Sequence, residues 1–509
     1  MPLNYADSFF SLLVPFVVIA LVLLTKRVVL SLFVGILIGG IMMHYQEPLS
    51  IFSYVYHKIS SVFYEYSSEN GLELSWDGIY VFLFTFFLGI LSQIVLVSGG
   101  VSAFVEWARD KVKDTRTSEF VAFFAGIVIF IDDYFNALTV GQIAKPLNAM
   151  HKSSKERLAY IIDSTSAPIC VLVPISSWGA YIIGVMQKSV PSESGSPLLV
   201  LLSSVSSNFY AWFALAGVFL AILWQVNLPV MHRNINVSAK DEHQEQYPAS
   251  KVFLLIAPIV VLVVCITFMI FYTGYKASGS LSVISMLAEC DTPFALFCGG
   301  SIALLCSFAL SSPYLKLSQV PNIIYNGITA MLPAVVILIL AWAIGPVIKG
   351  DLQTGVYLGN LVKNSLPSEF LTFLPVLLFL ISAFISFATG TSWGCFAIMI
   401  PIAVELALQS GGDMIFALSA VLAGAVYGDH TSPISDTTIL SSIGAGCSPQ
   451  SHFITQFPYA TISAFCALIS FAILSLSGSP LLSMVVGGGM LIGIFFYLKG
   501  KYGGELKGV

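Results

Sequence analysis

The sequence predicts an all-α polytopic membrane protein with about eleven transmembrane spans, two re-entrant hairpins and two inverted repeats with broken helices. Three observations predict this fold class. Hydrophobic residues make up 57% of the 509 residues and charged residues only 10%. Apolar runs recur along the whole chain, and a similar polar motif interrupts them in each half. Soluble domains, by contrast, carry about 25% charged residues.

The apolar runs have the pattern of membrane-spanning helices. They approach or reach the roughly 20 residues that a helix needs to cross a bilayer, and they are continuously apolar, unlike the alternating strands of a β-barrel. We interpret the first run as a retained span, because no basic residue precedes it and no small-residue cleavage pattern follows it. The clearest runs are Phe9–Leu24, Val28–Met43, Tyr80–Val97, Trp212–Val226, Val252–Tyr272, Ala334–Ile348 and Leu481–Leu498.

Basic residues predict which loops face the cytoplasm. Clusters of Lys and Arg at 109–116 and 145–157 flank the apolar segment Phe120–Val140, and the positive-inside rule places both clusters in the cytoplasm. A single crossing would put one cluster outside, whereas a re-entrant hairpin keeps both inside. We therefore predict a hairpin over about residues 119–148 with its tip near Asp132–Asn136, since non-helical backbone at this depth is tolerated inside protein.

The second half contains a similar interruption. The apolar segments Phe370–Phe387 and Ile398–Leu408 flank Thr389–Gly394, whose hydroxyl residues and two glycines favour a turn. We predict a second hairpin over about residues 369–410, which the alternation of spans opens to the outside.

A shared motif relates the two halves. Asp163–Pro168 and Asp429–Pro433 each read Asp-x-Thr-Ser with a proline within two residues, and each follows a predicted hairpin. Because the hairpins open to opposite sides, we predict inverted repeats; the alternative is chance similarity among membrane helices. The predicted units are a first repeat over 1–231, a cytoplasmic linker over 232–251, a second repeat over 252–478, and a final span with a cytoplasmic tail over 479–509.

Ionisable residues inside a bilayer are costly and mark functional positions. Burial disfavours the charged form of a carboxyl group, so such a group can hold either a proton or a small cation. Carbonyls freed by the motif prolines, with hydroxyl and carboxylate oxygens, make a shell suited to sodium, and we place such a site at Asp429, Thr431 and Ser432. The candidate ion-binding or proton-carrying residues are Asp132, Asp133, Asn136, Asp163, Thr165, Ser166, Asp429, Thr431, Ser432 and Asp436.

These residues also have structural interpretations. Asp132 or Asp133 suits a helix cap beside the break, and only one of them is expected to face a site, because neighbouring side chains point about 100° apart on a helix. The hydroxyl groups of the two motifs can instead form hydrogen bonds with the backbone groups that a kinked helix leaves without partners. Asp436 suits the first turn of a half-helix that Ser435 caps.

The second hairpin turn, and the helix that is predicted to begin after Ser435, contain groups that can bind an organic solute. An exposed helix N-terminus attracts anions, and His430 adds a group that titrates near neutral pH. A structural hydrogen bond for His430, and packing for Trp178 and Trp393, are the plainer interpretations. The candidate substrate-binding residues are Thr389, Gly390, Thr391, Ser392, Trp393, His430, Ser435 and Thr437.

The sequence lacks patterns typical of enzymes and ATP-driven pumps. It has no metal-ligand spacing, no Gly-Lys-Ser/Thr phosphate loop and no Gly-x-Ser-x-Gly nucleophile elbow. Its eight cysteines include no Cys-x-x-Cys pair, and we expect them to be small core residues. We expect no enzyme activity, no cofactor and no nucleic-acid partner. The expected partners are Na+ and H+ as transported or coupling ions, and membrane lipid.

The run Gly428–Ser442, which reads Gly-Asp-His-Thr-Ser-Pro-Ile-Ser-Asp-Thr-Thr-Ile-Leu-Ser-Ser, resembles the NhaC-type Na+/H+ antiporter family. Similarity continues at Phe130–Asn136, Asp163–Pro168, Gly444–Cys447 and Gln456–Ala460, so the resemblance covers most of the chain from about residue 80 to 465. That family belongs to the ion-transporter superfamily. The resemblance implies inverted repeats with hairpins, sodium/proton exchange, a bacterial-type inner membrane and a homodimer.

Two functions follow from these features. The first is a Na+/H+ antiporter that exchanges sodium for protons at a midplane site of Asp and hydroxyl residues. The second is a Na+- or H+-coupled transporter of an amino acid or a small organic acid, since proteins similar to the family carry such solutes with shared ion machinery. A channel and a membrane enzyme are the remaining alternatives. A channel would not require paired hairpins with titratable residues at their tips.

Overall fold

The protein is an α-helical bundle. Its computed structural model describes residues 5, 8–25, 27–67, 71–109, 111–151, 153–233, 247–354, 357, 372–433 and 435–504. Among these residues, seven helices are long and apolar enough to cross a membrane, or up to nine if each of two bent helix pairs is one span. Four further apolar helices are shorter. The chain is a multi-pass membrane protein, and the count of about eleven spans stays a prediction.

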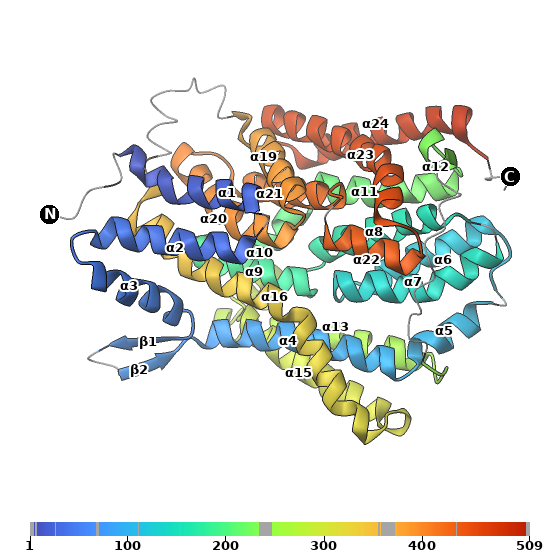
Figure 1. The fold of residues 1–509 in the computed structure, drawn as a ribbon, viewed down its shortest axis with the longest axis horizontal. Coiled ribbons are helices and arrows are strands. Elements are labelled where there is room, and N and C mark those ends of the chain that lie inside the picture. The colour runs from blue at the N-terminus through green and yellow to red at the C-terminus, as the bar shows by residue number, and fades with distance from the viewer. Residues whose placement is uncertain are drawn as a thin grey trace.

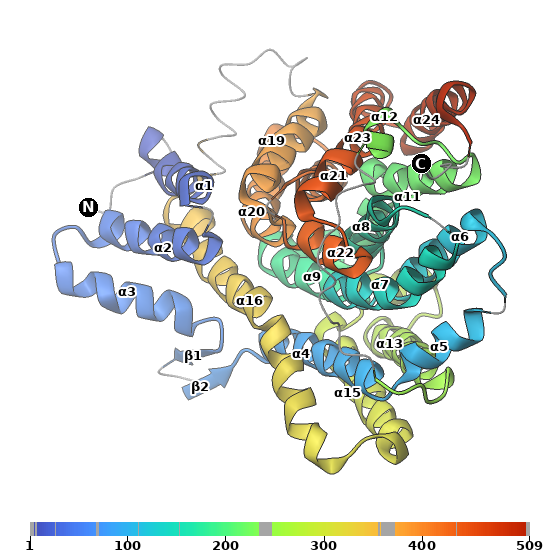
Figure 2. The same ribbon diagram turned by 45° about the vertical axis from the view of Figure 1, so that its right-hand side comes forward.

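One group of helices, here called the outer bundle, lies along one side of the molecule (Figures 1 and 2). Its elements are α1 (Leu13–Thr25), α2 (Val28–His44), α3 (Pro48–Ser60), β1 (Tyr64–Ser67), β2 (Gly71–Leu74), α4 (Trp76–Val97), α13 (Phe253–Ser278), α14 (Val283–Ala288), α15 (Thr292–Ser311) and α16 (Val320–Pro346). Helix α4 packs against α15 and α16, and α2 packs against α1, α3 and α16. The strands form an antiparallel pair with Tyr64 opposite Leu74.

The second group, here called the core bundle, contains the helix breaks. Its elements are α6 (Thr115–Val128), α7 (Asp133–Met150), α8 (Lys155–Leu172), α9 (Ser177–Ser189), α10 (Pro197–Val205), α11 (Phe209–Leu223), α19 (Leu374–Thr389), α20 (Ser392–Ser410), α21 (Met414–His430), α22 (Asp436–Ala445), α23 (Pro449–Ser477) and α24 (Pro480–Tyr502). Helix α8 is its centre, because every residue from Glu156 to Leu172 is buried. Seven helices pack against its described residues: α6, α7, α9, α11, α21, α22 and α23.

Short elements complete the chain. Helix α5 packs against α7 and α13, and so links the two bundles. The short elements are α5 (Gly100–Arg109), α12 (Pro229–Arg233), the 3-10 turns η2 (Phe9–Leu12), η3 (Ser192–Ser194), η4 (Ser312–Tyr314) and η5 (Leu317–Gln319), and the π-turn η6 (Val347–Asp351).

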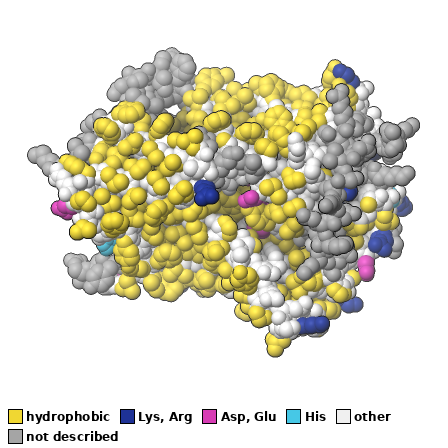
Figure 3. Space-filling model, viewed as in Figure 1, with side chains coloured by type: hydrophobic (Ala, Val, Ile, Leu, Met, Phe, Trp, Pro, Cys, Tyr) yellow, Lys and Arg dark blue, Asp and Glu magenta, His cyan; other side chains and the backbone are white. Residues whose placement is uncertain are grey.

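Apolar side chains cover much of the molecular face in Figure 3, with few charged ones among them. Helix α24 shows how this surface arises. Its buried residues, Ser483, Gly487, Leu491 and Phe495, form one stripe at a spacing of four residues, which is the face that packs on the core. The other faces of this apolar helix are exposed, as expected for a span in contact with lipid tails.

The chain turns back between α6 and α7. The side-chain amide of Asn136 donates to the carbonyls of Gly126 (2.7 Å) and Ile129 (2.8 Å), which satisfies backbone groups that the break leaves without helical partners. At the open end, the Thr115 hydroxyl donates to the His151 carbonyl (2.6 Å). The two ends of this hairpin therefore lie side by side.

A second hairpin joins α19 and α20. Gly390 ends α19 in the left-handed conformation (φ +70°), which glycine adopts without the steric cost of a Cβ atom. The two helices pack against each other, and α19 also packs along α21. The first three residues of the predicted hairpin, 369–371, lie outside the described residues.

Two further breaks follow the hairpins. Helix α8 passes into α9 with a bend of 40°, and α21 is separated from α22 by a short irregular segment. In each break a serine caps the following helix. Ser176 accepts a hydrogen bond from the Gly179 N–H (2.9 Å), and Ser435 accepts one from the Thr437 N–H (3.1 Å). The capping role predicted for Ser435 is confirmed.

Arg157, counted in the basic cluster at 145–157, is buried, and the cytoplasmic side predicted for that cluster stays a prediction. Its side chain is 1% exposed and pairs with Glu119, with 3.2 Å between Nε and Oε1. It also donates to the carbonyls of Ala221 (2.7 Å) and Val226 (2.7 Å). A buried charge needs such a set of partners, and this set holds α6, α8 and the end of α11 together.

The boundaries of the two repeats stay predictions. Much of the linker, 234–246, and the end of the tail, 505–509, lie outside the described residues. The hairpin shape of α6–α7 and of α19–α20 is present in the structure. Their entry into the membrane from opposite sides, which inverted repeats require, stays a prediction.

Cysteine labelling tests the first hairpin. We expect Thr115→Cys and Met150→Cys, each in a variant without the eight native cysteines, to react with an impermeant thiol reagent from the same face of the membrane. The reason is that the two ends of the hairpin lie side by side in the fold, where residue 115 adjoins His151. The measurement compares inside-out with right-side-out vesicles, with Ile129→Cys, which is buried at the turn, as an unlabelled control. Labelling from opposite faces would contradict the hairpin.

Candidate functional site

Helices α7 and α22 cross at two glycines in the centre of the core bundle. A Cβ atom at Gly141 would lie 2.5 Å from the Cα atom of Gly444, and a Cβ atom at Gly444 would lie 2.7 Å from the carbonyl oxygen of Ala137. Only glycine allows the two backbones to approach this closely. The crossing places the broken helix of the second half against the hairpin of the first half, with α8 beside both.

The Asp429 carboxylate joins the second hairpin to the break after α21. Its Oδ2 accepts a hydrogen bond from the Ser392 N–H (3.0 Å) and lies 2.7 Å from the Ser392 Oγ. Its Oδ1 accepts a hydrogen bond from the Ser435 hydroxyl (2.5 Å). The side chain is 2% exposed. Groups from the hairpin tip and from the start of α22 therefore converge on one buried carboxylate.

Asp132 and Asp133 are neighbours with different surroundings. Asp132 caps α7: its carboxylate accepts hydrogen bonds from the Phe135 N–H (3.0 Å) and the Ser177 hydroxyl (2.8 Å). The Asp133 carboxylate is equally buried, and neither of its oxygens has a hydrogen-bond partner among the described residues. The indole of Trp178, whose N–H is also without a partner in this part of the chain, lies beside it. The cap interpretation is thus confirmed for Asp132.

Further buried hydroxyls on α7 and α22 have no hydrogen-bond partner among the residues that the structure describes. They belong to Thr139, Thr438 and Ser441, and none of them forms a hydrogen bond within the described ranges. Buried polar groups are normally hydrogen-bonded. These two helices therefore carry oxygen atoms that are suited to a hard cation such as sodium.

Asp163 lies in a separate cluster at the centre of α8. Its Oδ2 accepts a hydrogen bond from the Gln456 side-chain amide (2.6 Å) and lies 3.2 Å from the His452 Nε2. His430 approaches the same oxygen to 3.9 Å, and its Nδ1 lies 2.6 Å from the Tyr210 hydroxyl. All five side chains are buried. His430, predicted to bind substrate, thus belongs to a hydrogen-bonded cluster away from the second hairpin turn.

The sequence patterns did not single out His452, Gln456 or Tyr210 as site residues. His452 lies in the first turn of α23 and is fully buried. A signal for it exists in the sequence. Polar residues follow one stripe of this otherwise apolar helix at spacings of three and four: Ser451, His452, Thr455, Gln456 and Tyr459.

The hydroxyl groups of the two Asp-x-Thr-Ser motifs mainly donate hydrogen bonds to backbone carbonyls. Thr165 and Ser166 donate to carbonyls of α8 itself. Thr431 donates to the Tyr427 carbonyl (2.7 Å), and Ser432 donates to the Phe387 carbonyl (2.7 Å). The structure thus brings Ser392 and Ser435 to the Asp429 carboxylate, and not Thr431 and Ser432 as we had predicted. Asn136 ties the first hairpin to α8 through the Thr165 carbonyl (3.2 Å).

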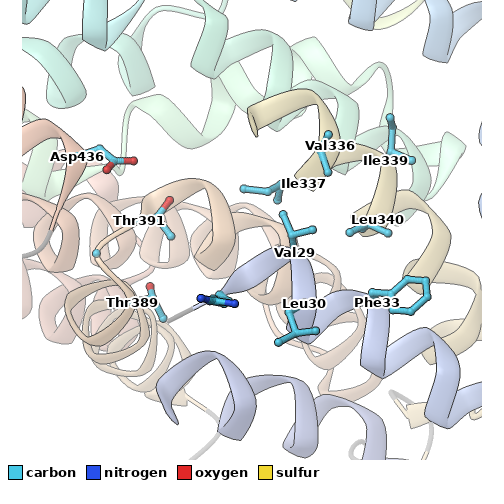
Figure 4. Close-up of a pocket in the computed structure, with 12 residues that line it drawn as sticks. Val29, Leu30, Phe33, Val336, Ile337, Ile339, Leu340, Thr389, Thr391 and Asp436 are labelled. Carbon is cyan, nitrogen blue, oxygen red and sulfur yellow. The ribbon is translucent and has the colours of Figure 1, made fainter. Parts of the chain in front are cut away.

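A pocket of about 980 Å³ separates the second hairpin turn from the outer bundle (Figure 4). Thr389, Gly390, Thr391 and Asp436 line it from the core bundle. Apolar side chains of α2 and α16 form the opposite wall, and Arg27 precedes α2 at its edge. Four of the residues predicted to bind ions or substrate therefore share this space. They are a separate set from those around Asp429.

Trp393 does not line this pocket. It packs against Tyr181 and Trp178, with ring centroids 4.6 Å and 5.7 Å away, and it is 9% exposed. The packing interpretation is therefore the one that its contacts support. Thr437 lies in the first turn of α22, with its hydroxyl 2.9 Å from that of Ser435.

Comparisons with known proteins agree with this architecture. A model of the Na+/H+ antiporter family matches residues 169–476, more than half of the chain. A Haemophilus influenzae protein, described as uncharacterized, is 36% identical over 98% of this chain and 96% of its own length. A malate-2H(+)/Na(+)-lactate antiporter of Bacillus subtilis is 35% identical over 31% of this chain and 33% of its own. The Alcanivorax borkumensis YdaH transporter shares the fold, with a TM-score of 0.51, 12% identity, and coverage of 85% of this chain and 90% of its own.

The membrane-length helices and these similarities define a multi-pass secondary transporter. The chain belongs to the Na+/H+ antiporter family. The resemblance that Gly428–Ser442 carries is thereby confirmed, because the matched range includes this run.

The glycine crossing offers a test of the core packing. We expect Gly141→Ala to lower the Tm of the detergent-solubilised protein, because overpacking a close contact costs about 1–3 kcal/mol. Gly489→Ala is the matched control, since Gly489 lies in an apolar helix with nothing within 4 Å of an added Cβ atom. Thermal unfolding followed by tryptophan fluorescence measures both variants. Equal Tm values for Gly141→Ala and the wild type would argue against the close crossing.

Proposed function

We propose that the protein is a Na+/H+ antiporter whose buried exchange site is formed by Asp133, Asp429 and the hydroxyls of Ser392 and Ser435. The observation that carries the proposal is the Asp133 carboxylate, which is buried without a hydrogen-bond partner in the described part of the chain. The charges of Asp132 and Asp429 act on it unfavourably. A buried carboxylate in such surroundings is stable only with a bound proton or cation, and alternate filling by the two ions is exchange.

We also propose that the two halves are inverted repeats. Each half has a helical hairpin followed by a break in which a serine, Ser176 or Ser435, caps the next helix. Each half also has an aspartate that joins hairpin tip and break: Asp132 binds Ser177, and Asp429 binds Ser392. Inverted repeats with broken helices are a common design of secondary transporters. The proposed location is the inner membrane of a bacterial-type cell.

A second candidate function is Na+- or H+-coupled transport of an amino acid or small organic acid. The pocket beside the second hairpin turn favours it, because it combines apolar walls with Thr389, Thr391, Asp436 and Arg27. Such a mixture suits a small solute that carries a carboxylate. The partial similarity to an antiporter named for malate and lactate supports this candidate.

Transport in proteoliposomes tests the primary proposal. An imposed sodium gradient is expected to change the internal pH, and Asp133→Asn or Asp429→Asn is expected to raise the apparent KM for sodium about 10- to 100-fold, since a bond to a charged group contributes about 1.5–3 kcal/mol. Asp413→Asn is the matched control, because Asp413 is exposed and caps α21 with an oxygen that asparagine also supplies. A wild-type sodium response in both buried-site variants would remove these carboxylates from the site.

A panel of labelled amino and organic acids separates the two functions. Under the primary proposal we expect a sodium-driven pH change without any added solute. Solute uptake without that pH change would favour the second candidate, and Arg27→Gln is then expected to reduce the uptake, because the variant loses the cation at the edge of the pocket.

A further inference from the structure

A buried acid–imidazole pair lies outside the proposed exchange site. Asp163 and His452 are both 0% exposed, and the Asp163 Oδ2 lies 3.2 Å from the His452 Nε2. The Asp163 Oδ1 and the His452 Nδ1 have no hydrogen-bond partner within the described residues. The pair therefore has free positions for protons although it is enclosed by protein.

The net charge of this pair depends on one proton. With His452 neutral, an ionised Asp163 leaves a negative charge in the core, and no Lys or Arg among the described residues forms a salt bridge with it. A proton on His452 turns the pair into an ion pair, which balances that charge. His430, whose Nε2 lies 3.9 Å from the same oxygen, differs from His452 because both of its ring nitrogens have hydroxyl partners, Tyr210 and Ser164.

Among the described residues, the histidines are the only basic side chains within salt-bridge distance of Asp163. Of the two basic residues of α8, Arg157 is bound by Glu119 and Lys155 is the first residue of the helix. Glu156 accepts a hydrogen bond from the Ser451 hydroxyl (3.0 Å). The remaining titratable groups near Asp163 are Tyr210 and Asp429, and the tyrosines Tyr160, Tyr427 and Tyr459 lie around Tyr210.

Gln456 connects the pair to the proposed exchange site. Its side-chain amide donates one hydrogen bond to Asp163 (2.6 Å) and one to the carbonyl of His430 (2.5 Å). That carbonyl belongs to the last residue of α21, immediately after Asp429. A change of charge at Asp163 and His452 alters the strength of this bond and thereby acts on the end of α21.

We propose that Asp163 and His452 form a proton-binding site separate from the exchange site, so that two protons move against each sodium ion. This inference rests on the proposed function. One proton alternates with sodium at Asp133 and Asp429, and the second binds the Asp163–His452 pair. Gln456 acts as a positioning residue between the two sites.

The ratio of protons to sodium tests the inference. In proteoliposomes with the membrane potential clamped at zero, a tenfold sodium gradient is balanced by a pH difference of about 0.5 for two protons per sodium and about 1 for one proton. We expect about 0.5 for the wild type and about 1 for His452→Gln and Asp163→Asn. His57→Gln is the control, because His57 is exposed on α3, and it is expected to match the wild type. Size-exclusion profiles confirm that each variant is folded.

The outcomes separate the two proposals. A balance point near 0.5 that moves to about 1 in either folded variant supports the second proton site. A wild-type balance near 1, or variants that balance where the wild type does, overturns this inference and leaves Na+/H+ exchange intact. A wild type without any sodium-driven pH change overturns the proposed function and this inference with it.

Discussion

A helix that breaks inside a membrane protein exposes backbone groups that must find partners within the protein, and the candidate site depends on this constraint. Asp132 caps α7, Ser176 caps α9 and Ser435 caps α22. Asp429 receives the N–H of Ser392 at the start of α20. The polar side chains that make the breaks stable are thus the side chains that gather in the centre of the core bundle. Ion-binding groups and structural groups are parts of one arrangement.

Buried carboxylates in this fold fall into two kinds. Glu119 and Asp132 are fully engaged, the first with Arg157 and the second with Ser177 and the start of α7. Asp133 has no hydrogen-bond partner within the described ranges, and Asp163 leaves one oxygen without one. A carboxylate with a full set of partners gains little from a further ion, whereas an unsatisfied one gains much. Asp133 and Asp163 are thus the acids most suited to exchangeable ions, whereas Asp429, whose oxygens are bound by neutral groups of Ser392 and Ser435, adds its negative charge to the proposed exchange site.

Local features of the fold could be predicted from the sequence. Composition and apolar runs indicated the helical membrane bundle, the glycine-containing Thr389–Gly394 segment indicated a turn, and Ser435 indicated a helix start. These predictions succeed because the physical cause lies within a few residues of the effect. Hydropathy, a left-handed glycine and a capping hydroxyl all act over one or two turns of chain.

Partnerships across the chain could not be predicted. Asp163 meets His452 from 289 positions away, and no local pattern encodes that meeting. The charge pattern gave no sign that Arg157 pairs with Glu119, which lies on another helix. The hydroxyls of Thr431 and Ser432 were assigned to sodium, although each donates to a backbone carbonyl. Whether a hydroxyl turns to its own helix or to a neighbour depends on packing that only the tertiary structure defines.

The two proposed sites both contact the C-terminal end of α21. Asp429 and His430 are consecutive, so on a helix their side chains point about 100° apart. The Asp429 carboxylate accepts the bonds from Ser392 and Ser435, and the backbone carbonyl of His430 accepts the bond from Gln456. Because this helix end is closely packed, a movement of the Asp429 side chain also moves the His430 carbonyl, and the reverse holds as well. Under the proposed function, the filling of either site therefore changes the geometry of the other without any contact between the two ions.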